Sequence, residues 1–219
     1  MVLCVAWTQM NACASPNIKD ICADLRQKIV CGVIMCWMLA GSLAMGQQAN
    51  ELVIDSFQYD TPEDAQAAWV RWFANSDDDA AQPVLPATIA GVRGLNFPYE
   101  FKSNTWRGSW DKVGKLNLAD FTHLKLRVNG SAASGAKKIL IAFMAGGEEW
   151  WTYPIDLADQ WQTVKIPLAE FKADKADKAD ESCSAWNDIR RIRISAIKTS
   201  EGPGSVAITD MRAVAEPVH

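Results

Sequence analysis

Aromatic side chains are the residues of this sequence that could form a ligand-binding surface. The chain has 219 residues and holds ten tryptophans against three tyrosines. An indole ring is large, rigid and amphipathic, so it can fill a core or stack on the flat apolar face of a ligand. The candidates for stacking lie in two short stretches, and they are Trp106, Trp110, Trp150, Trp151 and Tyr153.

Two arginines are candidates for the polar part of such a surface. Arg127 and Arg193 each alternate with aliphatic residues, so both leave the core side of their predicted strands. A guanidinium offers five N–H donors in a planar fork and could orient a ligand through bidentate hydrogen bonds. If the two strands are neighbours, both arginines share one sheet face. The alternatives are core packing for each aromatic ring and simple solvation for each arginine.

The sequence offers little for catalysis. It contains no Gly-x-Ser-x-Gly, no His-Glu-x-x-His and no glycine-rich phosphate loop. Cys183 is the one cysteine after residue 46, and only His123 and His219 could accompany it, so we expect neither a catalytic thiol nor a zinc site. We therefore expect no catalytic residues and no enzyme. The net charge of −4 also predicts no basic surface for nucleic acid.

Alternation of apolar and polar residues dominates the sequence from residue 51 onward and predicts short strands. Glycine and proline separate these runs, as at 146–147 and 202–204. The one helix predicted covers residues 62–73, where Pro62 suits the first turn. Many short strands predict an all-β fold, a two-sheet antiparallel β-sandwich. Its core should contain Leu126, Ile141 and Ile194.

The N-terminal residues predict export. Residues 29–46 carry no charge, Arg26 and Lys28 precede them, and Ala44 and Gly46 are small residues just before Gln47. This is the pattern of a secretory signal peptide, and an uncleaved anchor is the alternative. We therefore expect an N-terminal extension and signal peptide at 1–46, a β-sandwich domain at 47–219, and a secreted, periplasmic or cell-envelope location.

Several motifs follow one another between residues 51 and 214. They read LVIDSFQYDTPEDAQAAWV at 52–70, FPYEF at 97–101, LNLADFTHLKLRVNG at 116–130, EEWWTYPIDL at 148–157, WQTVKIPLAEF at 161–171 and WNDIRRIRISAIK at 186–198. In this order they resemble the galactose-binding-like jelly rolls, especially the β-glucan-binding modules of secreted bacterial proteins. The resemblance implies a jelly roll, and carbohydrate binding in some relatives.

Carbohydrate binding would give the aromatic residues a role. Sugar rings present apolar C–H faces edged with hydroxyls, so a binder needs an aromatic platform beside hydrogen-bonding groups. We expect a non-catalytic module that binds polysaccharide or another glycan. A structural or assembly domain, with neighbouring envelope or secreted proteins as partners, is the alternative. The expected ligand-binding residues are Trp106, Trp110, Arg127, Trp151, Tyr153 and Arg193, with Trp150 as the alternative to Trp151.

The resemblance also implies a structural calcium that joins the first and last strands. The matching residues are Asp55 and Asp210, whose carboxylates would supply oxygen ligands. The alternative is that each carboxylate caps a strand end or a turn. We expect no other cofactor.

Overall fold

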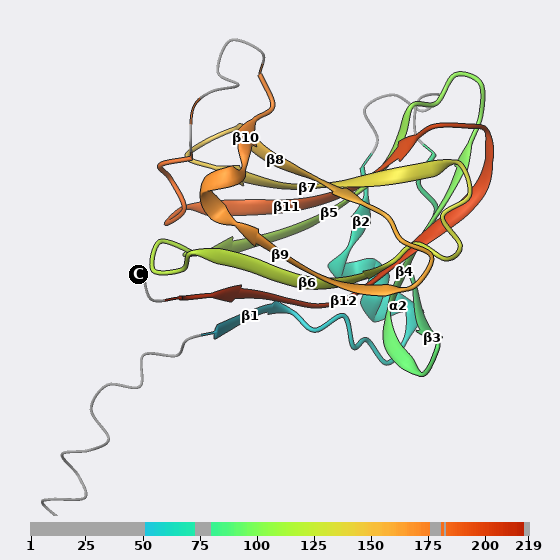
Figure 1. Ribbon diagram of the computed structural model, residues 1–219, viewed down its shortest axis with the longest axis horizontal. Coiled ribbons are helices and arrows are strands. Elements are labelled where there is room, and N and C mark those ends of the chain that lie inside the picture. Colours follow the sequence, from blue (N-terminus) through green and yellow to red (C-terminus); the bar gives the residue numbers. More distant parts are fainter. Residues whose placement is uncertain (1–50, 73–79, 176–180, 182, 217–219) are drawn as a thin grey trace, which may run out of the picture. The chain divides into compact units, whose positions relative to one another are not determined.

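The computed structural model describes residues 51–72, 80–175, 181 and 183–216 (Figure 1). These residues belong to a compact unit, Ala49–His219. The predicted signal peptide, residues 1–46, lies outside the described residues. None of the helices in the described part of the chain is long and apolar enough to cross a membrane.

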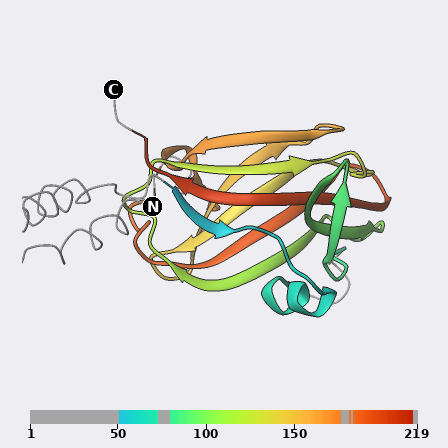
Figure 2. The ribbon, with the colours of Figure 1, turned by 90° about the horizontal axis from the view of Figure 1, so that it is seen from below.

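Two antiparallel sheets form the two layers of the fold (Figures 1 and 2). The first, which we call sheet A, has the order β3 (Leu85–Ile89), β4 (Val92–Phe101), β12 (Gly202–Val214), β6 (His123–Asn129) and β9 (Trp161–Pro167), with β1 (Glu51–Asp55) paired to the C-terminal half of β12. The second, sheet B, has the order β10 (Lys172–Ala173), β8 (Glu149–Asp156), β7 (Ala136–Ala145), β11 (Ile189–Lys198), β5 (Arg107–Leu116) and β2 (Val70–Arg71). The predicted two-sheet β-sandwich is confirmed.

The core lies between the two sheets and follows the alternation of the sequence. Leu126 of β6, Ile141 of β7 and Ile194 of β11 are completely buried, as predicted. Because side chains alternate between the faces of a strand, the neighbours of these residues point away from the core. The outward positions of β5, β7, β8 and β11 therefore form one continuous surface on the outside of sheet B.

The helix α2 spans Pro62–Ala68 and is shorter than the predicted 62–73. The Thr61 hydroxyl caps its first turn by accepting a hydrogen bond from the Asp64 backbone N–H at 3.1 Å. The helix ends because Trp69 adopts an extended conformation and buries its indole in the core. The chain then continues as β2, which pairs with β5 and brings Trp72 to the edge of sheet B. In Figures 1 and 2, α2 lies beside β3 at one end of the sandwich.

A short η1 helix (Leu168–Glu170) connects β9 in sheet A with β10 in sheet B. The hairpin between β7 and β8 turns at Gly146 and Gly147, whose φ angles of 62° and 114° favour glycine. This turn sets Trp150 opposite Met144 in the register of the two strands.

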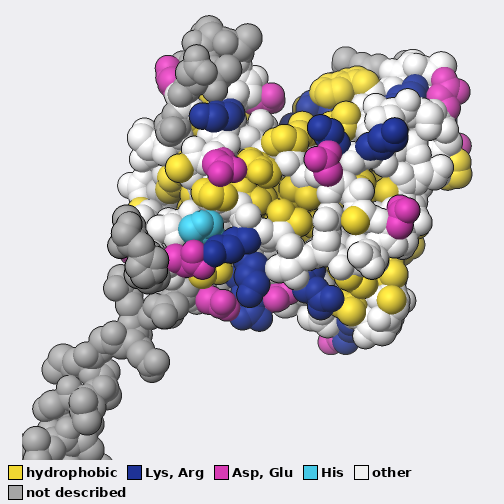
Figure 3. Space-filling view, viewed as in Figure 1, with side chains coloured by type: hydrophobic (Ala, Val, Ile, Leu, Met, Phe, Trp, Pro, Cys, Tyr) yellow, Lys and Arg dark blue, Asp and Glu magenta, His cyan; other side chains and the backbone are white. Residues whose placement is uncertain are grey.

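On the face shown in Figure 3, basic and acidic side chains are interspersed and hydrophobic side chains gather near the middle.

Candidate functional site

Five side chains form a stacked row on the outer face of sheet B, and we call this the Trp–Arg row. The guanidinium carbon of Arg193 lies 4.3 Å from the ring centroid of Trp150 and 4.2 Å from that of Trp72. The guanidinium carbon of Arg107 lies 4.9 Å from the centroid of Trp72 and 4.0 Å from that of Trp106. All four distances are within the roughly 6 Å limit of cation–π contacts. Aromatic and cationic groups therefore alternate in the order Trp150, Arg193, Trp72, Arg107 and Trp106.

Trp72 lies between the two arginines of this row. Its backbone N–H donates to the Ser109 carbonyl at 3.0 Å, and Ser109 pairs with Ser195 across β5 and β11. In the same register Arg193 lies on one side of this serine pair and Arg107 on the other. The two hydroxyls are 2.8 Å apart and buried, although they point away from the core. The two arginines therefore flank the serine pair along the strands, and both guanidinium groups reach Trp72.

An ion pair fixes the orientation of Arg193. Its Nε donates to Oδ1 of Asp111 at 2.6 Å, and its Nη2 donates to Oδ2 at 2.8 Å. Both side chains are buried, and Arg191 adds a further hydrogen bond to Asp111 at 3.3 Å. Two parallel N–H to carboxylate bonds define the plane of a guanidinium. Asp111 of β5 therefore fixes the plane of the Arg193 guanidinium, which Trp150 and Trp72 contact.

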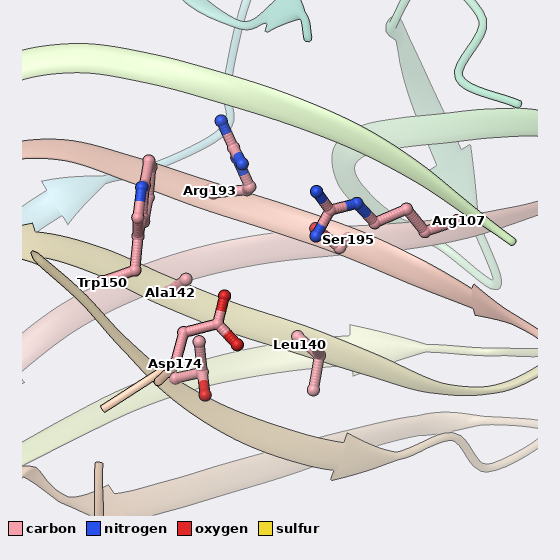
Figure 4. Close-up of a pocket in the computed structure, with 8 residues that line it drawn as sticks. Arg107, Leu140, Ala142, Trp150, Asp174, Arg193 and Ser195 are labelled. Atoms are coloured by element: carbon pink, nitrogen blue, oxygen red, sulfur yellow. The ribbon is translucent and has the colours of Figure 1, made fainter. Parts of the chain in front are cut away.

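A hollow opens beside the Trp–Arg row, over β7 (Figure 4). Trp150 and Arg107 lie at its opposite ends, and Ala142 is one of the small residues that leave it open. Thr152 and Asp174 contribute oxygen atoms from the side of β8 and β10. The hollow is shallow: its cavity volume is about 20 Å³, and the wider space at its mouth is open to solvent. A cavity of that size has room for about one water molecule, so it can receive a hydroxyl of a group that lies against the surface but cannot enclose a sugar ring.

The family model named carbohydrate binding domain 30 matches residues 64–215. This range covers more than half of the chain and includes every strand from β2 to β12. The chain belongs to the carbohydrate binding domain 30 family. All five residues of the Trp–Arg row lie inside the family match.

Solved structures similar to this member of the family include two of the family 11 carbohydrate-binding module of Clostridium thermocellum. One is in complex with a β-1,3-1,4-mixed-linked tetrasaccharide, with 15% identity over 77% of this chain and 98% of that chain and a TM-score of 0.56. The other belongs to a cellulosomal cellulase, with 16% identity over 77% and 96% and a TM-score of 0.54.

An exo-β-agarase is also similar, with 13% identity over 76% of this chain and 25% of that chain and a TM-score of 0.51. At such low identities these likenesses show the fold. No curated protein sequence matches the chain.

Among the residues predicted to bind ligand, Trp106 lies on the outside of the domain and is 53% exposed. Trp110 and Trp151 are buried in the core, so the prediction of a ligand-facing ring is wrong for both. Trp110 pairs in register with Ile194, which faces the core, and its Nε1 donates to the Gln82 carbonyl at 2.8 Å. Trp151 shares the inward side of β8 with Tyr153, whose ring centroid lies 5.7 Å from that of Phe171. Alternation along β8 gives the outward position to Trp150 instead.

The two predicted arginines belong to different sheets. Arg127 lies on β6 of sheet A, where its guanidinium carbon is 5.5 Å from the ring centroid of Trp161. Arg193 lies on β11 of sheet B. They would share a sheet face only if their strands were neighbours, and they are not, because β6 pairs with β9 and β12 while β11 pairs with β5 and β7. The expectation of one ligand-binding face that holds both arginines is therefore wrong. Both side chains leave the core, but they do so on opposite sides of the sandwich.

Sequence reasoning missed Trp72 and Arg107. The sequence predicts a helix that continues through Trp72, whereas Trp72 follows the short strand β2. Arg107 begins a period-two pattern with Ser109 and Asp111, which alternates with the buried Trp110. That pattern is the signal that could have placed Arg107 on the outer face.

Asp55 and Asp210 do not fit a shared calcium. Oδ2 of Asp55 accepts hydrogen bonds from Lys112 Nζ at 2.6 Å, the Tyr59 hydroxyl at 2.7 Å and Trp69 Nε1 at 3.0 Å. Asp210 instead accepts from Arg212 Nε at 2.5 Å. Each carboxylate thus has its own basic partner. In the described part of the chain, no group of three or more His, Cys, Asp or Glu residues could hold a metal ion.

Cys183 also lacks the character of a nucleophile. Its side chain is buried, and this burial raises the pKa of the thiol above its ordinary value of 9.0. The thiolate is the reactive form of cysteine, so the raised pKa disfavours reaction near neutral pH.

Proposed function

We propose that this chain is a non-catalytic carbohydrate-binding module that binds polysaccharide on the outer face of sheet B. The observation that carries the proposal is the position of Trp150, at one end of both the Trp–Arg row and the hollow. A sugar ring that stacks on this indole would place its hydroxyls over the hollow. Thr152, Asp174 and Arg107 are among the hydrogen-bonding side chains of the lining that would meet them there.

Trp106 supplies a second platform at the far end of the row. Trp150 and Trp106 each carry one guanidinium on one face. Among the described residues, neither has a second arginine or another aromatic ring stacked on it. A ligand that touches both rings must extend along the row, which favours a polysaccharide chain over a single sugar.

The charges around the hollow favour an uncharged polysaccharide. Arg193 and Arg191 share the negative charge of Asp111, and Arg107 and Asp174 add one charge of each sign to the lining, so positive and negative groups nearly balance around the hollow. Binding to such a surface relies on stacking and hydrogen bonds, so it should depend little on salt. The similar family 11 module was solved with a β-1,3-1,4-linked tetrasaccharide, which makes mixed-linkage β-glucan the first ligand to test.

The same geometry supports the proposal of binding without hydrolysis. Glycoside hydrolysis needs two carboxylates on either side of the bond, about 5–10 Å apart. Of the residues that line the hollow, Asp174 is the one acid, and Asp111 beneath the row is engaged by two arginines. We propose export as well, on the strength of the charge-free segment 29–46 after Arg26 and Lys28.

The test is titration of soluble mixed-linkage β-glucan, and separately of mannan, into the intact chain and two variants. Trp150→Ala should weaken β-glucan binding about tenfold or more, because aromatic anchors dominate binding energies. Trp161→Ala is the matched control, because Trp161 lies on the opposite sheet next to Arg127. This variant should bind β-glucan as tightly as the intact chain does. Absence of binding to either polysaccharide, or equal binding by both variants, would contradict the proposal and favour a structural or assembly domain.

A further inference from the structure

We propose that Arg193 is a positioning residue, which holds the ring of Trp150 in place for the ligand without touching the ligand itself. The inference rests on the proposed function of the outer face of sheet B. It gives Arg193 a role other than the two that the sequence leaves open, which are direct hydrogen bonding to the ligand and simple solvation.

Arg193 is one of the residues that line the hollow, but its surroundings leave a ligand little of its side chain to contact. The residue is 8% exposed, and Trp150 and Trp72 lie over its guanidinium at 4.3 and 4.2 Å. Its Nε and Nη2 both donate to Asp111. The stacking surfaces and two of the three nitrogens are therefore already engaged before any ligand arrives.

The same contacts restrict Trp150. The Asp111 carboxylate fixes the guanidinium plane, and that plane presents a flat surface to the indole. A tryptophan on a sheet surface otherwise has several rotamers, which a ligand must reduce to one on binding. If the ring is already held in one rotamer in the ligand-free protein, ligand binding loses less side-chain entropy. Arg193 thus contributes to affinity by preorganising Trp150.

Trp72 is the support on the other side of Arg193. The guanidinium carbons of Arg193 and Arg107 both lie within 5 Å of its ring centroid, so less of this ring is left for a sugar than of Trp150 or Trp106, each of which has one guanidinium partner. Its backbone N–H is anchored to the Ser109 carbonyl of β5. The row therefore has two stacking platforms at its ends, Trp150 and Trp106, and a support between them.

The chemistry requires arginine rather than lysine at position 193. A lysine ammonium keeps the charge but has no plane on which an indole can stack and no fork to match a carboxylate. Arg193→Lys therefore removes the positioning surface while leaving a cation next to Asp111. Arg191→Lys is the matched control, because Arg191 lies on the same strand and also donates to Asp111. In the described part of the chain no tryptophan stacks on Arg191.

The experiment measures two quantities: the mobility of the Trp150 ring in the ligand-free protein, and the affinity for ligand. In the ligand-free protein, ¹⁵N relaxation of the Trp150 indole N–H should show a lower order parameter in Arg193→Lys than in the intact chain or in Arg191→Lys. Titration with a mixed-linkage β-glucan oligosaccharide should then give affinity about threefold to tenfold weaker for Arg193→Lys, the range expected for one side chain that must be ordered on binding. The Arg191→Lys affinity should equal that of the intact chain.

Two results would overturn the inference. An unchanged Trp150 order parameter in Arg193→Lys would show that Arg193 does not hold the ring. Complete loss of binding with an unchanged ring would assign Arg193 to the ligand directly. Failure of the intact chain to bind any β-glucan would reject the proposed function instead, while the ligand-free order parameter would still decide whether Arg193 positions Trp150.

Discussion

Trp150 and Trp151 are neighbours in the sequence and lie on opposite sides of sheet B. The ring of Trp150 stacks on Arg193 at 4.3 Å outside the sandwich. Trp151 is 4% exposed and belongs to the core cluster. Successive residues of a strand point to opposite faces, so one indole is available for a ligand and the other for stability.

Alanine substitution should separate these two roles. Trp151→Ala should lower the free energy of unfolding by about 3–5 kcal/mol, because it leaves a large cavity in the core. Trp150→Ala should leave most of the stability intact and remove most of the glycan affinity. Denaturant unfolding and calorimetric titration of both variants check this, and equal destabilisation by the two substitutions would show that the faces of β8 are assigned the wrong way round.

The aliphatic core should respond in the same way. Replacing Leu126, Ile141 or Ile194 by alanine should each cost about 2–5 kcal/mol of unfolding free energy, since all three are completely buried. Val113→Ala is the control, because Val113 is 71% exposed on β5 and its truncation leaves no cavity. A Val113 variant as unstable as the core variants would contradict the packing described.

Calcium should have no effect on stability. The Asp55 carboxylate is buried and already holds the Lys112 ammonium at 2.6 Å, which supplies the positive charge that a metal would otherwise provide. The melting temperature should therefore be the same with excess Ca²⁺ and with EDTA. Lys112→Met should lower the free energy of unfolding by about 3–5 kcal/mol, because it leaves a buried carboxylate without its cation. A melting temperature that falls on adding EDTA would restore the calcium hypothesis.

Alkaline pH should destabilise the fold through its tyrosines. The pKa of Tyr59, of Tyr99 and of Tyr153 lies above the ordinary value of 10.0, in each case mainly because burial disfavours the phenolate. The unfolded chain loses these protons near pH 10, so the stabilisation is complete below that pH and is lost as the pH rises above it.

Tyr99→Phe isolates one of these contributions. The Tyr99 hydroxyl is buried and has no hydrogen-bond partner among the described residues, so its removal should cost little at neutral pH. Urea unfolding at pH 8 and pH 11 should show a smaller loss of stability with pH in this variant. If the variant and the intact chain lose the same unfolding free energy between pH 8 and pH 11, Tyr99 does not contribute to the alkaline destabilisation.

Export should leave a defined N-terminus. The small residues Ala44 and Gly46 before Gln47 predict cleavage after Gly46. Mass spectrometry of the exported protein should find a chain that begins near Gln47. A full-length chain retained in the membrane fraction would show an anchor instead.

Most of the fold could be predicted from the sequence because burial follows period-two alternation. The pattern placed Leu126, Ile141 and Ile194 correctly in the core. It could not give the order of strands within a sheet, since pairing depends on contacts between distant segments. For that reason Arg127 and Arg193 were expected on one face although they lie in different sheets.

The candidate site was harder to predict for a local reason. Two adjacent indoles satisfy alternation in either phase, so the sequence alone left Trp150 and Trp151 as alternatives. Trp72 follows a helix that ends early because Trp69 turns into the core. Its contacts with Arg193 and Arg107 arise only when β2 pairs with β5.

The most direct test of the account is the indole region of an NMR spectrum during titration with mixed-linkage β-glucan oligosaccharide. Each tryptophan contributes one indole N–H signal, eight of the ten tryptophans lie after residue 46, and the signals are assigned by substituting the tryptophans one at a time. We predict that the signals of Trp150 and Trp106 shift with ligand, while those of the buried Trp110 and Trp151 and of Trp161 on the opposite sheet stay in place. Shifts confined to Trp161, or no shift in any indole signal, would contradict a binding site on the outer face of sheet B.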